Sequence, residues 1–130
     1  MCGLVDLKTN MGTTVKVADI KLPCIDNMVK QARYCGCISE IILFGSALEK
    51  RCREDSDIDI AIISRYTVNK LSGNKEFSRF MESVYDYDFM QEYDRLYFSS
   101  MEEIEKNRYK SDICNELMMN GKIVYSRQGD

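Results

Sequence analysis

Two short segments decide the fold of this chain: LFGSAL at residues 43–48 and EDSDIDI at residues 54–60. Gly45 and Ser46 end a nearly continuous apolar run, residues 38–44, of the kind found in a buried central strand. Glycine lets the backbone turn sharply and approach a ligand closely. The serine hydroxyl and the amides of a helix that follows can then face an anion. The first segment therefore predicts a strand that ends in a phosphate-binding turn.

The second segment places two carboxylates on one face of the next strand. Asp57 and Asp59 lie two residues apart at the start of a β-branched run, residues 58–63, so their side chains project from the same face. Aspartate is depleted in strands, and neighbouring carboxylates raise each other's pKa unless a cation lies between them. Mg²⁺ takes oxygen ligands of this kind and commonly bridges them to substrate phosphates. The pair therefore predicts a site for Mg²⁺, or for Mn²⁺ in its place.

The distance between the two segments along the chain predicts how they face each other. Only ten residues separate Ser46 from Asp57, and a short helix at residues 47–52 plus a loop does not easily carry the chain back along a whole strand. We therefore expect antiparallel strands, with the turn and the carboxylates at one edge of the sheet. Gly-Ser alone is commonly a helix N-cap, and alternating Asp and Ile alone is commonly a solvated strand face. Their combined spacing favours a binding site.

The remaining hydrophobic patterns predict an α/β (α+β) fold. Residues 1–22 are weakly patterned, and we expect an N-terminal extension of uncertain structure ahead of a single domain at residues 23–130. Pro23 in the first turn favours the start of a helix there. The expected elements of the domain are helices at residues 24–34, 77–84, 101–106 and 113–118, strands at residues 38–44, 58–63, 93–98 and 122–125 (the last at a sheet edge), and a loop at residues 66–74.

The composition is that of one globular domain, with 130 residues, 45% hydrophobic and 30% charged. A net charge of −3 disfavours a non-specific nucleic-acid binder, although it leaves room for a local basic patch. Neither a signal peptide nor an apolar run near the roughly 20 residues that span a bilayer is visible. We therefore expect the six cysteines to be free thiols in the cytoplasm, with no membrane partner. Because the chain has no histidine, catalysis would rest on carboxylates, lysine, tyrosine or a metal.

The pattern Gly45-Ser46, ten residues, Asp57-x-Asp59 resembles the catalytic motif of the DNA polymerase beta-like nucleotidyltransferase superfamily. It is most similar to the small stand-alone domains called minimal nucleotidyltransferases, over about residues 24–126. The resemblance implies a mixed β-sheet flanked by helices. It also implies transfer of a nucleoside monophosphate from a Mg²⁺-bound triphosphate, ATP foremost, to a hydroxyl on a protein or small molecule. In that scheme Gly45 and Ser46 contact phosphate, while Asp57 and Asp59 bind metal and Asp59 is shared between two ions.

The resemblance further implies a third aspartate on a later strand, which holds the second metal and acts as base. Asp94 fits this role best, and Asp88 is the alternative. Larger relatives carry a helical domain for the acceptor, and a chain of this length has no room for one. We therefore expect a protein acceptor, or a partner subunit such as a helical protein or a toxin. The alternative to an enzyme is a non-catalytic nucleotide-binding or antitoxin-like module of the same fold.

Two further groups of side chains have both a functional and an ordinary explanation. Lys50, Arg51 and Arg53 lie between the two motif segments and could contact a triphosphate, but cations at this position commonly face solvent at a helix C-terminus. Five tyrosines could stack on a nucleobase, but most are expected to be core or amphipathic strand residues. These are Tyr85, Tyr87, Tyr93, Tyr97 and Tyr109.

Overall fold

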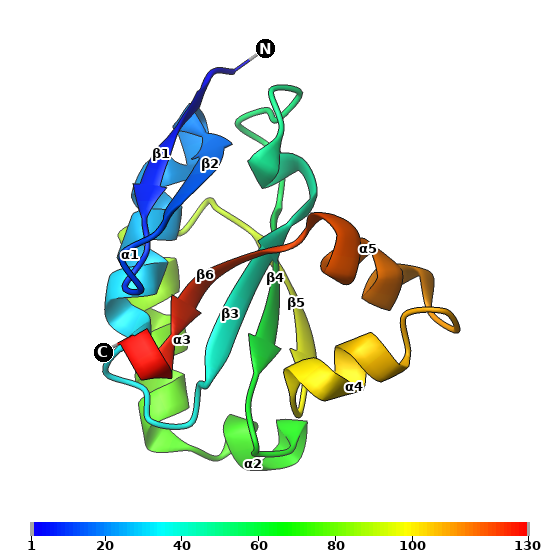
Figure 1. Ribbon diagram of the computed structural model, residues 1–130. Coiled ribbons are helices and arrows are strands. Elements are labelled where there is room, and N and C mark those ends of the chain that lie inside the picture. The colour runs from blue at the N-terminus through cyan, green and yellow to red at the C-terminus, as the bar shows by residue number, and fades with distance from the viewer. Residues whose placement is uncertain (1, 130) are drawn as a thin grey trace.

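The computed structural model describes residues 2–129, and Figure 1 shows a sheet between two layers of helices with a hairpin beside it. The strands are β1 (Leu4–Lys8), β2 (Thr14–Ala18), β3 (Glu40–Phe44), β4 (Ile58–Ile63), β5 (Tyr93–Phe98) and β6 (Lys122–Ser126). The α-helices are α1 (Leu22–Ala32), α2 (Val68–Ser72), α3 (Lys75–Tyr87), α4 (Met101–Lys106) and α5 (Asp112–Asn120). Short 3₁₀ helices cover Asp19–Lys21, Gly45–Leu48 and Arg127–Gly129. The predicted α/β class, with a mixed sheet flanked by helices, is confirmed.

The central sheet has the strand order β5-β4-β3-β6. Strand β3 is antiparallel to both β4 and β6, whereas β4 and β5 are parallel. The antiparallel pairing of β3 with β4 confirms the arrangement inferred from their ten-residue spacing, and β6 lies at an edge as expected. The parallel pair needs a longer crossover, which the segment containing α2 and α3 supplies.

Alternation along the strands divides the core into two layers. On β4, the three even-numbered isoleucines pack with α1, α3 and the hairpin, whereas Ala61 and Ile63 pack with α4 and α5 on the other face. Because both faces are buried, β3 and β4 are nearly continuous apolar runs. Asp59 shares its face with Ala61 and Ile63, so it lies on the α4–α5 side near the end of the sheet.

The N-terminal segment forms a β-hairpin that the sequence patterns did not predict. Strands β1 and β2 pair antiparallel along their whole length, and Gly12 in the connecting turn has a φ of 79°, a conformation that favours glycine. Leu7 and Val17 are fully buried in the layer that contains α1 and α3. Residues 4–18 therefore form part of the main core.

Two connecting segments differ from the expected structure. Residues 47–52 form no α-helix, because the 3₁₀ helix gives way to extended backbone at Glu49 and Cys52 is drawn into the core. Tertiary contacts override the local helix propensity there. Residues 66–74, expected to be a loop, contain the short helix α2, which is capped by the Thr67 side chain.

The structure also bears on the cysteines and on membrane crossing. All six cysteines are free thiols, as expected, and five of them are buried. No helix within residues 2–129 combines the length and the apolar character that a membrane crossing requires.

Shortening a buried hairpin side chain tests whether the hairpin belongs to the cooperative core. Leu7 is 1% exposed, so Leu7→Ala is expected to lower the free energy of unfolding by about 2–4 kcal/mol. Lys8→Ala, at the exposed neighbouring position, should change it by less than about 0.5 kcal/mol. Urea denaturation measures both, and equal small effects would mean that the hairpin unfolds separately.

Candidate active site

The strand register brings two aspartates side by side. Asp59 on β4 lies opposite Asp94 on the parallel strand β5, and on its other side it lies opposite Phe44, the last residue of β3. Gly45 and Ser46 follow Phe44 directly. The predicted phosphate turn and two of the predicted carboxylates therefore meet at one end of the sheet.

Asp57 joins this group from the residue that precedes β4. It is two residues from Asp59, and its negative charge helps to raise the pKa of Asp59. Asp57 and Asp94 are exposed, whereas Asp59 is half-buried. Asp59 is thus the least exposed of the three predicted aspartates, and the charges of the other two act on it.

Burial and like charge raise the pKa of Asp59 to about 6. Desolvation is the largest cause, followed by hydrogen bonding to Asp94 and by the negative charges of Asp94 and Asp57. Arg51 acts in the opposite direction. Without a metal, Asp59 therefore keeps a proton at a pH where an ordinary aspartate has lost it, and a divalent cation could take the place of that proton.

Gly45 lets the turn pack directly against Asp59. Its φ of 75° lies in the left-handed region, and a Cβ at this position would overlap Oδ2 of Asp59 and lie 3.2 Å from its Cγ. Any other residue would either displace the carboxylate or move the turn. The glycine of the motif is therefore required both by the backbone conformation and by the closeness of the acid.

Ser46 lies in a 3₁₀ helix and not at the start of an α-helix as predicted. Its carbonyl accepts a hydrogen bond from the Glu49 amide at 2.9 Å. Its hydroxyl makes no hydrogen bond to any residue between 2 and 129. The expected row of helix amides is thus reduced to one short turn, and the serine hydroxyl remains as a group able to contact a phosphate oxygen.

Asp88, the alternative third carboxylate, lies apart from this group. Its Oδ1 accepts a hydrogen bond from the Met90 amide at 3.0 Å, and its Oδ2 lies 3.8 Å from the Cys24 sulfur. The structure therefore brings Asp94 to Asp59, and places Asp88 at the end of α3.

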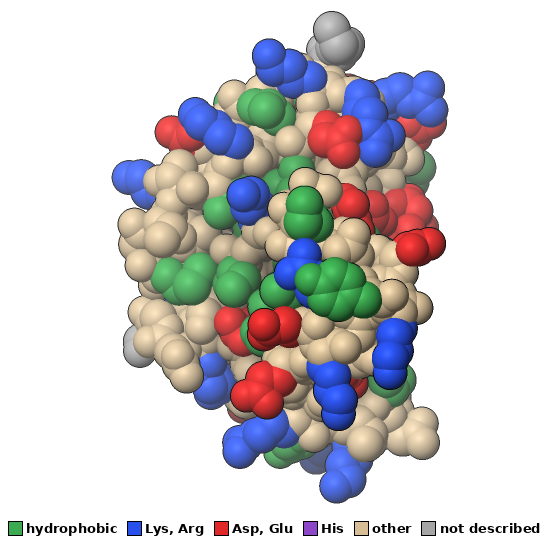
Figure 2. Space-filling view, turned by 45° about the vertical axis from the view of Figure 1, so that its right-hand side comes forward, with side chains coloured by type: hydrophobic (Ala, Val, Ile, Leu, Met, Phe, Trp, Pro, Cys, Tyr) green, Lys and Arg blue, Asp and Glu red, His purple; other side chains and the backbone are tan. Residues whose placement is uncertain are grey.

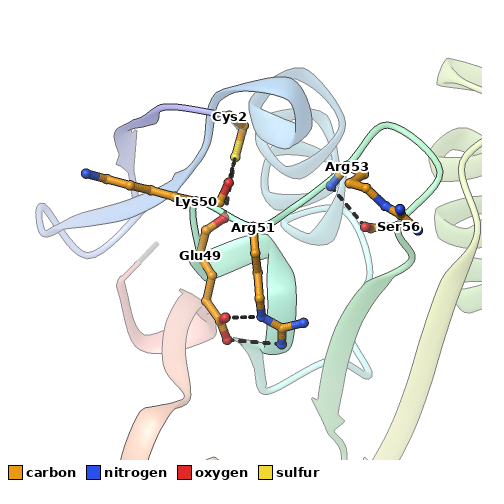
Figure 3. Close-up of polar contacts among 6 residues, drawn as sticks. All are labelled: Cys2, Glu49, Lys50, Arg51, Arg53 and Ser56. Carbon is orange, nitrogen blue, oxygen red and sulfur yellow. Dashed lines mark hydrogen bonds and ion pairs between the residues drawn. The ribbon is translucent and has the colours of Figure 1, made fainter.

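The loop that follows the turn carries three cations (Figure 3). Arg51 forms an ion pair with Glu49, in which Nη2 lies 3.3 Å from Oε1. Its positive charge also lowers the pKa of Asp59. Lys50 and Arg53 point in other directions from the same loop (Figure 3). Arg51 is thus the loop cation that acts on the acidic group.

Two further residues hold the backbone just before Asp57. Lys21 and Gln91 donate hydrogen bonds to carbonyl groups of this loop from distant parts of the chain, and both are buried. Sequence reasoning missed them, because one lysine ahead of a helix and one glutamine in a polar stretch look like solvent-exposed residues.

The donor set suits a hard divalent cation in its chemistry. The three aspartates offer only oxygen ligands. Desolvation is the largest cause of the raised pKa of Asp59, and a cation would relieve the repulsion from Asp94 and Asp57 that adds to it. Among residues 2–129, however, no three His, Cys, Asp or Glu side chains are arranged to hold an ion as they stand. A bound ion would therefore require an exposed carboxylate, Asp57 or Asp94, to turn toward Asp59.

The sequence model of the family described as "Polymerase beta, Nucleotidyltransferase" matches residues 29–130. The chain belongs to this family. The matched residues contain the turn, the three aspartates and the whole central sheet of the polymerase beta nucleotidyltransferase domain. The hairpin and Lys21 precede them. A search of curated proteins found no match.

The contact between Gly45 and Asp59 predicts that substitutions at these positions are coupled. Gly45→Ala should destabilise the protein, because an alanine at positive φ costs about 1–2 kcal/mol and its Cβ overlaps the Asp59 carboxylate. In an Asp59→Ala background only the backbone cost remains. A double-mutant cycle by urea denaturation should therefore give a coupling of at least about 0.5 kcal/mol, and additive effects would contradict the packing described.

The raised pKa of Asp59 predicts a pH dependence of stability in the presence of EDTA. The folded protein holds a proton that the unfolded chain releases near 3.8, so stability should fall as the pH rises from about 4 through about 6. Asp59→Asn cannot ionise and should be the more stable protein above pH 6. Two pKa units correspond to about 3 kcal/mol, and solvent screening at this half-exposed site reduces the expected gain to about 1 kcal/mol.

Thermal unfolding between pH 4.5 and 7.5 measures this difference. Asp55→Asn is the control, because Asp55 is 79% exposed and, among residues 2–129, forms an ion pair only with Arg53, at 3.5 Å. A loss of stability in Asp59→Asn at pH 7.5 would show that the ionised carboxylate is favoured in the folded state.

Proposed function

We propose that this domain transfers a nucleoside monophosphate from a Mg²⁺-bound triphosphate, ATP foremost, to a hydroxyl acceptor. The observation that supports this best is the contact between Asp59 and Asp94 beneath the Gly45 turn, within a domain of the polymerase beta nucleotidyltransferase family. Carboxylates held together at the cost of a raised pKa are typical of sites that bind cations or move protons.

Each residue of the group has a distinct role in this proposal. Asp57, Asp59 and Asp94 hold the metal, which when bound neutralises the phosphates and polarises the reacting phosphorus centre. Gly45 and Ser46 contact the triphosphate. Asp94, exposed on the edge strand β5, accepts the proton of the attacking hydroxyl. The acceptor oxygen then bonds to the α-phosphorus. The bond between the α-phosphorus and the oxygen that joins it to the β-phosphorus breaks, and pyrophosphate leaves.

The acceptor in this proposal is a protein or a small molecule rather than nucleic acid. On the face shown in Figure 2, Lys and Arg side chains are interspersed with Asp and Glu and form no continuous basic surface. Nucleic-acid binding usually relies on such a surface. A protein acceptor, a toxin or a helical partner subunit would instead present one hydroxyl to the exposed Asp94. The six free cysteines favour the cytoplasm as the location.

A second candidate is a module that binds the nucleotide without catalysis or acts as an antitoxin-like partner. It is favoured by the absence, among residues 2–129, of three side chains already arranged around an ion position. If Asp94 does not turn toward a bound ion, the second metal and the base are missing, and only binding remains.

Labelled ATP distinguishes the two candidates. Incubation with Mg²⁺, co-purified proteins and hydroxyl-bearing small molecules should give label transfer that EDTA abolishes. Asp57→Asn should reduce transfer by at least about 100-fold, because the metal loses a ligand. Ser46→Ala should weaken ATP binding only by about 1 kcal/mol, since one hydrogen bond is lost.

Asp88→Asn is the matched control, because it removes the alternative third carboxylate, which lies apart from Asp59. It should transfer label like the wild type. Mg²⁺-dependent ATP binding without transfer to any acceptor would support the binding module. ATP binding that is unchanged by Asp59→Asn and by EDTA would contradict the metal site on which the proposed transfer depends.

A further inference from the structure

Lys21 is a buried lysine whose hydrogen bonds go to the chain segments that precede Asp57 and Asp94. It belongs to the 3₁₀ helix between the hairpin and α1, and it is 1% exposed. Its ammonium group donates hydrogen bonds to the carbonyl oxygen of Glu54 at 2.8 Å and to Oε1 of Gln91 at 2.7 Å. It forms no ion pair with a carboxylate within residues 2–129. Burying a charge against neutral acceptors is costly, so this lysine is a poor choice for packing alone.

Gln91 connects Lys21 to the two chain segments that lead to Asp57 and Asp94. Its Nε2 donates hydrogen bonds to the carbonyl oxygens of Ser56 at 3.1 Å and of Glu92 at 2.8 Å. Ser56 directly precedes Asp57, and Glu92 lies two residues before Asp94. One amide group therefore bridges the loop that carries Asp57 and the chain that enters β5.

Lys21 fixes which way the Gln91 amide faces. An ammonium group has donors only, so it can contact the oxygen of the amide but not its nitrogen. With Oε1 held by Lys21, the NH₂ group must face the two carbonyls. Without the lysine, the amide could flip, so that the Ser56 carbonyl would lose the Gln91 donor and the Glu92 carbonyl would keep only the Ile58 amide.

The backbone on either side of Asp57 is held by this arrangement. The Ser56 carbonyl accepts from Gln91, and the Ile58 amide donates to the Glu92 carbonyl at 3.0 Å. The exposed side chain of Asp57 is therefore attached to a peptide segment that is fixed at both ends, although no regular strand contains it.

We propose that Lys21 is a positioning residue, which acts through Gln91 to hold Asp57 in register with Asp59 and Asp94 for metal binding. Its catalytic meaning rests on the proposed function. Lys21 lies before the residues that match the family, 29–130. In this proposal, the N-terminal segment therefore supports the metal site of the family domain.

The first test is independent of nucleotide chemistry. The loop carries the trypsin sites Lys50, Arg51 and Arg53, all exposed, so native-state digestion followed by mass spectrometry reports how firmly it is held. Lys21→Met keeps the length of the side chain and removes the donors, and it should raise cleavage in this loop by about tenfold. Val84→Ala, a substitution at a buried position in α3, is the control for loss of stability, and it should not raise cleavage in this loop. Equal cleavage in the two variants would overturn the proposal.

The second test measures metal affinity, with Mn²⁺ as the probe and ATP present. Lys21→Met should weaken Mn²⁺ binding by about 10- to 100-fold, as is usual when the support of a metal ligand is removed. Lys21→Arg, which keeps the donors, should recover part of the loss. Gln91→Glu should reproduce the defect, because it keeps the acceptor for Lys21 but loses the NH₂ group.

The outcomes separate this inference from the proposed function. If the wild type binds no Mn²⁺ with ATP, the proposed function fails, while the digestion still shows whether Lys21 holds the loop. If the wild type binds the metal and Lys21→Met binds it equally well, Lys21 is a structural residue and the inference is wrong.

Discussion

The strand register places two carboxylates side by side, and they repel each other. The structure at this end of the molecule depends on that repulsion. The parallel pairing of β4 with β5 sets Asp59 against Asp94, and burial of Asp59 removes the water that would otherwise separate their charges. The surrounding sheet is packed on both faces, so the strands cannot shift to relieve the contact. In the metal-free protein a proton on Asp59 relieves it below about pH 6, and in the proposed enzyme a cation does.

The parts of the site that could be predicted from the sequence are those determined over short distances along the chain. Ten residues between Ser46 and Asp57 are too few for a parallel crossover, so the antiparallel pairing of β3 and β4 follows from chain length alone. The same-face projection of Asp57 and Asp59 was inferred from the period of a strand, but β4 begins at Ile58, so for Asp57 it stays a prediction. Gly45 was predicted for its backbone freedom, and the structure adds a second reason, the direct contact with Asp59.

The parts that could not be predicted depend on contacts between distant segments. Asp94 was favoured over Asp88 through the family resemblance, but its place directly opposite Asp59 depends on the register of β5 against β4, which no local pattern specifies. The hairpin consists of two five-residue strands, a length at which alternation is a weak signal. Residues 47–52 have the composition of a helix, but the burial of Cys52 and the contacts of the loop with the N-terminal segment prevent one.

The aspartates of the site are therefore held in place in two different ways. Asp59 and Asp94 lie on paired strands, where backbone hydrogen bonds and two core layers fix their positions. Asp57 lies outside the strand, and two part-buried carbonyl groups near it, those of Glu54 and Ser56, accept from buried side chains. A carbonyl that is left unpaired when buried costs about 1–3 kcal/mol, and part of that cost applies here. Lys21 and Gln91 meet that need with donors alone facing the carbonyls. A buried ammonium, unfavourable by itself, is thus tolerated because removing it would take a donor from the Glu54 carbonyl and release the amide that donates to the Ser56 carbonyl.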